Sequence, residues 1–161
     1  MAEVWTDDRQ DRVAVETENL TKIATRILRL LRREGTGLSI VVTDAEEIQR
    51  YNREYLGRDR PTNVISFPMM EGEPVAGDAS YLGDVVLSVD AAEKEARELG
   101  YTLGEMLLLY LIHGILHLSG YDHEGVSKEK ALEMERKQAE LFDILAPLIE
   151  RYPLISSKTP A

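Results

Sequence analysis

Apolar residues recur along this chain at two spacings, and each spacing predicts a different kind of element. Spacings of three and four residues in segment 18–34, at Leu20, Ile23 and Ile27, predict a helix with one apolar face. Short apolar or alternating runs predict strands at 12–16, 38–42, 63–67 and 82–88. Further helices are predicted at 44–55, from Ser88 or Asp90 to Gly100, at 102–118, and from a cap at Ser127 to an end at Pro147.

Polar residues and a glycine mark the expected ends of two of these helices. Asp44 with Glu47, and Thr102 with Glu105, have the spacing of a capping box, which satisfies the first backbone N–H groups of a helix. Gly120 stands where a glycine commonly ends a helix, because it can adopt a positive φ. The segment from Met69 to Tyr81 has glycine, proline and acids without periodicity, so it is predicted to be a loop.

The order of these elements predicts an α+β fold. About five helices lie before, between and after about four strands, which is typical of a small mixed sheet packed on helices in a single-domain sandwich. Segment 102–118 is apolar on nearly all sides, so it is expected to be the central, buried helix. Residues 1–161 are expected to form one domain, with a frayed tail from about residue 154.

Composition limits the chemistry of this domain. The 161 residues include no cysteine, so a metal would have to be held by imidazole, carboxylate or water. No signal peptide and no run of roughly 20 apolar residues is present, which predicts a cytoplasmic protein without a membrane segment. The net charge of −10 argues against coating nucleic acid by bulk electrostatics. Local basic segments remain, however, because Arg50, Arg53, Arg58 and Arg60 fall within eleven residues.

All three histidines of the chain lie in one window, HGILHLSGYDH, from His113 to His123. His113 and His117 are four apart on the predicted central helix and therefore share one face. Gly120 lets the chain reverse, so that His123 can return toward the first two. Three imidazoles with a fourth position open to water are the ligand set of a catalytic zinc site, which lowers the pKa of the bound water to roughly 7.

Two features of the window decide between alternatives. Ordinary packing of histidines does not explain this order with Gly120 in place, so a metal site is the preferred interpretation. Metzincin peptidases share the spacing but carry a general-base glutamate after the first histidine, where this chain has Gly114. Gly114 argues against that peptidase mechanism, and it suggests a close approach of backbone or substrate. Three imidazoles favour one Zn²⁺ per chain, although another divalent transition metal would also be accepted.

The sequence strongly resembles the YbeY family of bacterial endoribonucleases, also described as rRNA maturation factors. The resemblance covers roughly residues 12–145 and rests on HGILHLSGYDH, RPTNVISFP (60–68) and LGDVVLS (82–88). It implies a metal-dependent hydrolase of single-stranded RNA that acts in 16S rRNA 3′-end maturation and ribosome quality control. By the same resemblance His113, His117 and His123 are zinc ligands on a zincin-like central helix. RNA and the small ribosomal subunit are the implied partners, with a ribosomal protein or ribosome-associated factor besides, and the chain is expected to be a monomer.

One position departs from the family pattern. Members commonly carry an arginine, thought to contact RNA, directly after the tyrosine that corresponds to Tyr55, and this chain has Leu56 there. Either Arg53, Arg58 or Arg60 supplies the substrate-binding charge from nearby, or RNA handling differs. The alternative interpretation of these arginines is a solvated surface turn.

The residue that transfers the proton is not assigned beyond a water on the metal. Asp84, Asp122 and Glu124 are the candidates, although Asp122 would also serve to orient a ligand histidine and Asp84 to hold a backbone turn. Two other functions stay open: a metal-dependent hydrolase of a non-RNA substrate, including a peptidase with an unusual base, and a non-catalytic ribosome-assembly factor with a structural metal.

Overall fold

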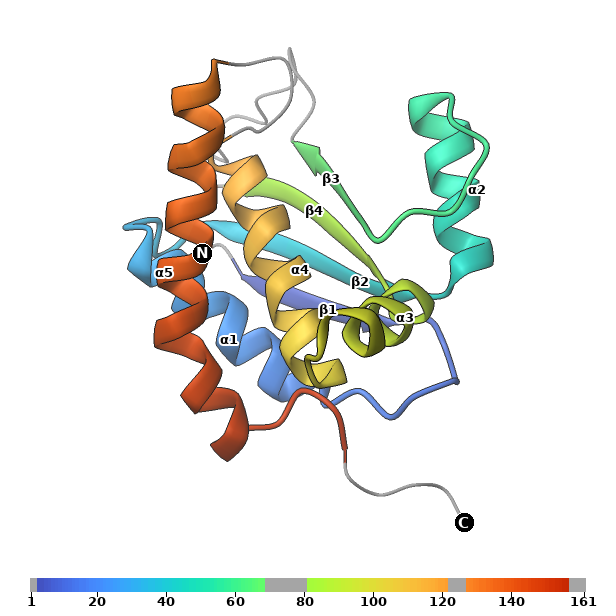
Figure 1. The fold of residues 1–161 in the computed structure, drawn as a ribbon, viewed down its shortest axis with the longest axis horizontal. Coiled ribbons are helices and arrows are strands. Elements are labelled where there is room, and N and C mark those ends of the chain that lie inside the picture. The colour runs from blue at the N-terminus through green and yellow to red at the C-terminus, as the bar shows by residue number, and fades with distance from the viewer. Residues whose placement is uncertain (1–2, 69–80, 122–126, 157–161) are drawn as a thin grey trace.

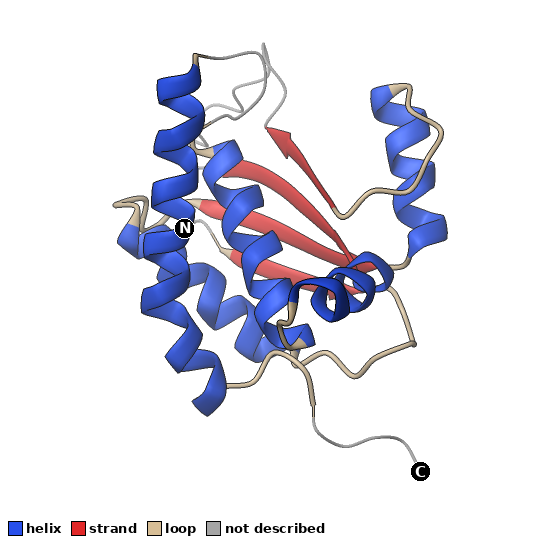
Figure 2. Ribbon diagram, in the orientation of Figure 1, coloured by secondary structure: helices blue, strands red, loops and turns tan. Residues whose placement is uncertain are grey.

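The structure is a computed structural model of the chain, and it describes residues 3–68, 81–121 and 127–156. The predicted loop at 69–81 lies outside the described part except for Tyr81. Asp122, His123 and Glu124 also lie outside it. Within that part there are four strands and five helices (Figures 1 and 2). They are β1 (Val4–Asp8), α1 (Thr17–Leu30), β2 (Gly37–Thr43), α2 (Ala45–Leu56), β3 (Val64–Pro68), β4 (Tyr81–Ser88), α3 (Val89–Leu99), α4 (Leu103–Leu118) and α5 (Lys128–Arg151).

The four strands form one mixed sheet in the order β1-β2-β4-β3. β1, β2 and β4 are parallel, whereas β3 runs antiparallel to β4 and forms one edge of the sheet. Figure 2 shows the helices gathered around this sheet. The predicted α+β class is confirmed.

Helices pack on both faces of the sheet. Adjacent residues of a strand point to opposite faces, and Val85 and Val86 of β4 show which helix lies on each. Val85 lies against Gly114 of α4, whereas Val86 packs with Ile48 of α2. The larger core lies on the α4 side, where α1 and α5 also contribute buried side chains. Figure 1 shows α2 set apart from these three helices.

The central helix α4 is built as its sequence predicts. Thr102 and Glu105 form the complete capping box, with each side chain accepting from the backbone N–H of the other residue. The helix is buried over most of its length, and Gly120 follows it with a φ of 101°. Among the described residues no single helix is long and apolar enough to cross a membrane; only α3 and α4 taken together, bent by 113°, reach that length and composition.

Three predictions from the sequence are wrong in detail. The first strand is Val4–Asp8, and segment 12–16 contributes only a single bridge from Val15 to Ile155. Helix α5 continues through Pro147 to Arg151, because the buried Leu145 and Ile149 on either side of the proline hold both turns in the core.

The tail, predicted to fray from about residue 154, is instead packed as far as Ser156. Leu154 is buried, and its carbonyl accepts from the Glu16 backbone N–H at 2.8 Å. The Ser156 N–H donates to the Ala14 carbonyl at 2.7 Å. Residues 154–156 are therefore packed against segment 14–16, and 157–161 lie outside the described residues.

Candidate active site

A cleft of about 380 Å³ runs along the edge strand β3. The helix α4 bounds one side, and α2 with the turn that follows it bounds the other. Its lining residues are Asn52, Leu56, Arg58, Arg60, Thr62, Asn63, Val64, Ile65, Ser66, His113 and His117. The cleft therefore brings two of the predicted metal ligands together with two of the predicted substrate-binding arginines.

The two described histidines reach the cleft from the same face of α4. His113 is half-buried and His117 is exposed, while most of the residues between them pack into the core. His123 lies outside the described residues. Within the described part, no third histidine, aspartate, glutamate or cysteine joins the pair to form a metal-binding group.

Gln138 of α5 lies within hydrogen-bond distance of the His113 ring. Its Oε1 lies 3.0 Å from His113 Nδ1, and an amide oxygen can only accept a hydrogen bond. With its amide oxygen facing the ring, Gln138 pairs with the tautomer that carries the proton on Nδ1, and this tautomer has the lone pair of the neutral ring on Nε2. A ligand histidine in proteins commonly donates its other N–H to an oxygen in this way, so the described donor set fits a divalent transition metal.

Gly114 places α4 close to the sheet. A Cβ at this position would lie 2.7 Å from Val85 Cγ1, which is closer than packed carbon atoms approach. The Ser66 hydroxyl also donates to the Gly114 carbonyl at 3.1 Å, which ties β3 to the helix beside His113. The close approach expected from the sequence is thus that of the helix to strand β4. A glutamate at this position would point between α4 and the sheet.

The buried Asn52 shapes the arginine-rich turn after α2. Gly57 ends the helix with a φ of 71°, and the chain then folds back over Asn52. The Asn52 Nδ2 donates to the Arg60 carbonyl at 2.9 Å, and the Asn52 carbonyl accepts from the Arg58 N–H at 3.1 Å. Only 3% of Asn52 is exposed. These bonds hold the backbone on which Arg58 and Arg60 reach the cleft, while both arginine side chains are themselves exposed.

The three candidate arginines differ in their surroundings. Arg53 is absent from the lining of the cleft, and its Nη1 lies 3.4 Å from Asp59 Oδ1. A hydrogen bond from Gln49, and then the charge of Arg53, lower the pKa of Asp59. Arg58 and Arg60 make no ion pair with any described residue. Leu56, which stands in place of the family arginine, also lines the cleft.

Asp84 points away from the histidines. Because Val85 faces α4, its neighbour Asp84 lies on the opposite face of the sheet. There its Oδ1 accepts a hydrogen bond from the Tyr81 hydroxyl at 2.5 Å. Burial, and then this bond, raise the pKa of Tyr81 to about 12. Asp84 is therefore wrong as a proton-transfer candidate for chemistry at His113 and His117.

The sequence alone assigns no role to five polar residues at or beside the cleft. They are Asn52, Thr62, Asn63, Ser66 and Gln138. Asn63 Nδ2 donates to Glu95 Oε1 at 3.2 Å, and Glu95 also accepts from the buried Tyr110 hydroxyl, so the start of β3 is tied to α3 and α4. Asn63 and Ser66 belong to the block RPTNVISFP, but no periodicity assigns a role to either. Gln138 lies 25 residues from His113, and no spacing rule connects them.

The fold and the cleft define a class of protein: an α+β chain whose central helix presents paired histidines beside an arginine-bearing turn. The family profile described as "Endoribonuclease YbeY" matches residues 5–146. A curated endoribonuclease YbeY of Geobacter metallireducens is 49% identical over 138 residues, which cover 86% of this chain and 92% of the relative. That of Syntrophotalea carbinolica is 45% identical over 142 residues, covering 88% and 95%.

A solved structure agrees with the fold. The solution structure of a Thermotoga maritima protein aligns over 100% of both chains with a TM-score of 0.64 and 25% sequence identity. The family match and the curated relatives extend over most of this chain. The chain belongs to the endoribonuclease YbeY family.

Proposed function

We propose that this chain is a zinc-dependent, single-strand-specific endoribonuclease that acts in 16S rRNA 3′-end maturation and ribosome quality control. The observation that supports the proposal most is the cleft, which is shared by His113 and His117 on one side and by Arg58 and Arg60 on the other. A phosphodiester that lies along β3 would contact both groups. Family membership supports RNA as the polymer.

His113, His117 and His123 are the proposed ligands of one Zn²⁺. The hydrogen bond from His113 Nδ1 to Gln138 supports this assignment, because it leaves Nε2 as the nitrogen that would coordinate the metal. Bound zinc would supply Lewis-acid stabilisation of a phosphate oxygen and lower the pKa of a coordinated water. Another divalent transition metal would serve the same ligands.

Arg58 and Arg60 are the proposed phosphate-binding residues. A guanidinium group matches phosphate oxygens with two parallel hydrogen bonds and remains charged at any physiological pH. Neither arginine forms an ion pair with a described residue, so both guanidinium groups can bind a phosphate of the substrate. Arg53, in contrast, is already paired with Asp59. Arg53 is therefore proposed only as a peripheral contact. Asp122 and Glu124 stay as candidates for proton transfer.

The chain is proposed to act as a monomer in the cytoplasm, on RNA of the small ribosomal subunit. A ribosomal protein or a ribosome-associated factor would help to bring it to that substrate. These assignments follow from the resemblance of the sequence to this family, whose description as an endoribonuclease supports RNA as the substrate.

Metal analysis and RNA cleavage of the same samples test the proposal. The unmodified protein should hold one zinc per chain and cleave single-stranded RNA, and His117→Ala should lose both properties. Arg58→Ala with Arg60→Ala should keep the metal but bind RNA weakly. Lys94→Ala with Arg97→Ala, on the exposed surface of α3, is the matched control with the same charge change and should behave like the unmodified protein.

Three outcomes would contradict the proposal. Cleavage that is unchanged in His117→Ala would remove the metal from the reaction. Cleavage of a peptide but not of RNA would favour a hydrolase of another substrate. Ribosome binding with bound metal and without any nuclease activity would favour an assembly factor with a structural metal.

A further inference from the structure

Tyr55 is the most exposed aromatic side chain in the described part of the chain, and it stands beside the cleft. It lies in the last turn of α2, and 67% of it is exposed. The next residue, Leu56, lines the cleft, as does Asn52 one turn earlier. An aromatic ring is thus exposed to water at the rim of the proposed RNA site.

The Tyr55 ring is held in place by two other aromatic residues. Its centroid lies 6.0 Å from that of Tyr51, with the planes 27° apart, so the two rings are stacked. Its centroid also lies 5.6 Å from that of Phe67 on β3, in an edge-to-face arrangement. Tyr51 and Phe67 are half-buried and pack against the small core of Ile48, Ile65 and Val86. The exposed ring therefore rests on a fixed base.

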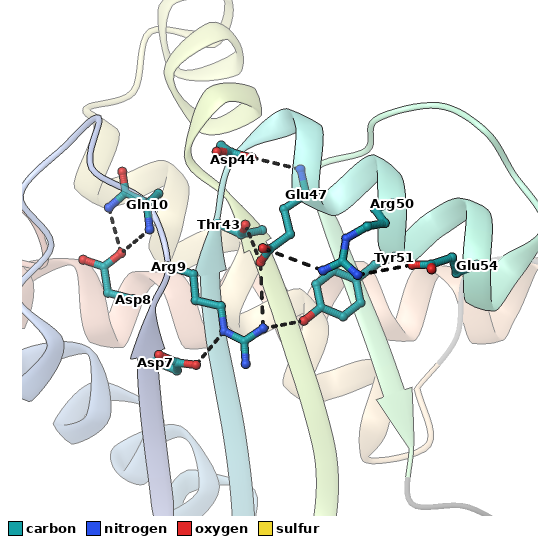
Figure 3. Close-up of polar contacts among 10 residues, drawn as sticks. All are labelled: Asp7, Asp8, Arg9, Gln10, Thr43, Asp44, Glu47, Arg50, Tyr51 and Glu54. Carbon is teal, nitrogen blue, oxygen red and sulfur yellow. Dashed lines mark hydrogen bonds and ion pairs between the residues drawn. The ribbon is translucent and has the colours of Figure 1, made fainter.

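Charged residues further restrain Tyr51, the ring on which Tyr55 stacks. The Tyr51 hydroxyl accepts from Arg9 Nη1 at 2.9 Å, and Arg9 is itself paired with Asp7 at 2.7 Å (Figure 3). The guanidinium of Arg50 lies 5.4 Å from the centroid of the Tyr51 ring, a cation–π distance. The support for Tyr55 thus reaches across to the end of strand β1.

Tyr51 and Phe67 pack against the small core, which explains why aromatic residues stand at these two positions. Tyr55 is largely exposed, so core packing does not explain an aromatic residue there. A tyrosine covered on both ring faces could not keep two-thirds of its surface exposed. Tyr55 therefore offers an aromatic surface whose orientation is already set, which lowers the entropy lost when a second ring stacks on it. Sites for single-stranded RNA combine such surfaces with cations that contact the backbone.

We propose that Tyr55 is a stacking site for a nucleobase of the RNA strand, next to the phosphate held by Arg58 and Arg60. The inference rests on the proposed function of the cleft and adds a subsite to it. Because every base has a π face, the site would hold an unpaired base of any sequence. A base in a duplex is stacked on its neighbours, so this site would also favour single-stranded substrate.

Binding of oligonucleotides with a missing base tests the proposal. Fluorescence anisotropy would measure the affinity of a single-stranded RNA of about 12 nucleotides, a length within the usual site sizes. A series of the same RNA would lack one base at each position in turn. The proteins are the unmodified chain, Tyr55→Ala, Tyr55→Phe, and Tyr152→Ala as the control for an exposed tyrosine elsewhere.

Stacking predicts a specific pattern. Tyr55→Ala should weaken binding of the intact RNA by about 5- to 100-fold, as loss of one base–aromatic stack does, whereas Tyr55→Phe and Tyr152→Ala should not. At one position, loss of the base should weaken binding to the unmodified protein, and Tyr55→Ala should add no further loss there. A thermal melt should show that Tyr55→Ala stays folded.

Other results would overturn the inference. An unchanged affinity of Tyr55→Ala, or a loss of equal size on every RNA of the series, would show that no base of the bound strand occupies a fixed place on the Tyr55 ring. If the unmodified protein binds no RNA, the proposed function fails and the subsite fails with it. Binding by the unmodified protein with no effect of Tyr55→Ala overturns the subsite alone.

Discussion

Gln138 of α5 accepts a hydrogen bond from His113 Nδ1 of α4, so a helix from the end of the chain orients the first histidine of the cleft. Both side chains are half-buried, which protects the bond from competition with water. The bond sets the tautomer and the rotation of the imidazole ring. Gln138 is therefore a positioning residue for the proposed metal site.

Replacing Gln138 should weaken metal binding without unfolding the protein. Gln138→Leu removes the acceptor and allows the other tautomer, so the affinity for zinc should fall by about 10- to 100-fold, as is typical when such a partner of a ligand histidine is lost. Gln138→Glu keeps an acceptor oxygen and should bind zinc at least as tightly as the unmodified chain. Competition with a chromophoric zinc chelator measures both values.

The matched control for this experiment is Glu135→Leu, an exposed position on the same helix. It introduces the same apolar residue into α5 without removing the hydrogen bond to His113 and should leave zinc affinity unchanged. Equal zinc affinities for Gln138→Leu and the unmodified protein would contradict the assigned role. A loss shared by Gln138→Leu and Glu135→Leu would point to a general effect on α5.

Gly114 should be required for the packing of α4 on the sheet. Gly114→Ala introduces a Cβ 2.7 Å from Val85 Cγ1, and overpacking of this kind costs about 1–3 kcal/mol, against about 1 kcal/mol gained from helix propensity. The variant should therefore be less stable in urea denaturation. Adding Val85→Ala should recover part of the loss, with a favourable coupling energy between the two sites. Additive effects would show that the two positions are not in contact.

Gly114→Glu would recreate the metzincin motif in sequence but should not produce a peptidase. The side chain at this position points at Val85 and Ser66, between the helix and the sheet. A glutamate there would have to be buried or would push α4 off the sheet. The expected result is a strongly destabilised protein without peptide cleavage. A folded variant that hydrolyses a peptide would contradict the placement of α4.

The parts of the fold that depend on local signals could be predicted from the sequence. The capping residues Asp44, Thr102 and Ser127 begin their helices as expected, because a cap is decided by neighbours three residues away. Strand β1 was missed because VWTDD has few apolar residues, and only its place at the sheet edge makes it a strand. The end of α5 was likewise predicted wrongly at Pro147, because the buried contacts on both sides of the proline outweigh the free-energy cost of placing it inside a helix.

The candidate site divides in the same way. His113 and His117 share a face by helical spacing alone, so their meeting in one cleft follows from the sequence. Asn52 and Gln138 act through bonds to residues in other parts of the chain, which no local pattern records. Alternation along β4 puts Asp84 and Val85 on opposite faces of the sheet but does not say which of them faces α4. Only the structure shows that Val85 does, and so places Asp84 on the face away from the two histidines.

Asp84 should be dispensable for RNA cleavage. Asp84→Asn keeps an oxygen that can accept from the Tyr81 hydroxyl, so the fold should be retained. Because the side chain lies on the far face of the sheet, the rate of cleavage should stay close to that of the unmodified protein. A single-turnover cleavage assay measures this rate, with His117→Ala as the inactive reference. A loss as large as that of His117→Ala would restore Asp84 as a proton-transfer candidate.

Tyr81 should make stability depend on pH in the alkaline range. Its pKa is about 12 in the folded protein against 10.0 for an unperturbed tyrosine, so the folded state holds the proton more tightly than the unfolded state. The resulting stabilisation is complete below pH 10.0 and is lost as the pH rises from there toward about 12. Tyr81→Phe carries no such proton and lacks this dependence.

The difference in unfolding free energy between the unmodified protein and Tyr81→Phe isolates this effect, because the lysines and the remaining tyrosines titrate equally in both proteins. The free energy of unfolding of the unmodified protein should fall relative to that of Tyr81→Phe as the pH rises from 10.0 to about 12. Urea denaturation at several alkaline pH values measures it. Asp84→Asn replaces the anionic acceptor with a neutral one, so Tyr81 should then ionise at lower pH, as followed by tyrosinate absorbance. A constant difference across the interval would contradict the burial and bonding of Tyr81.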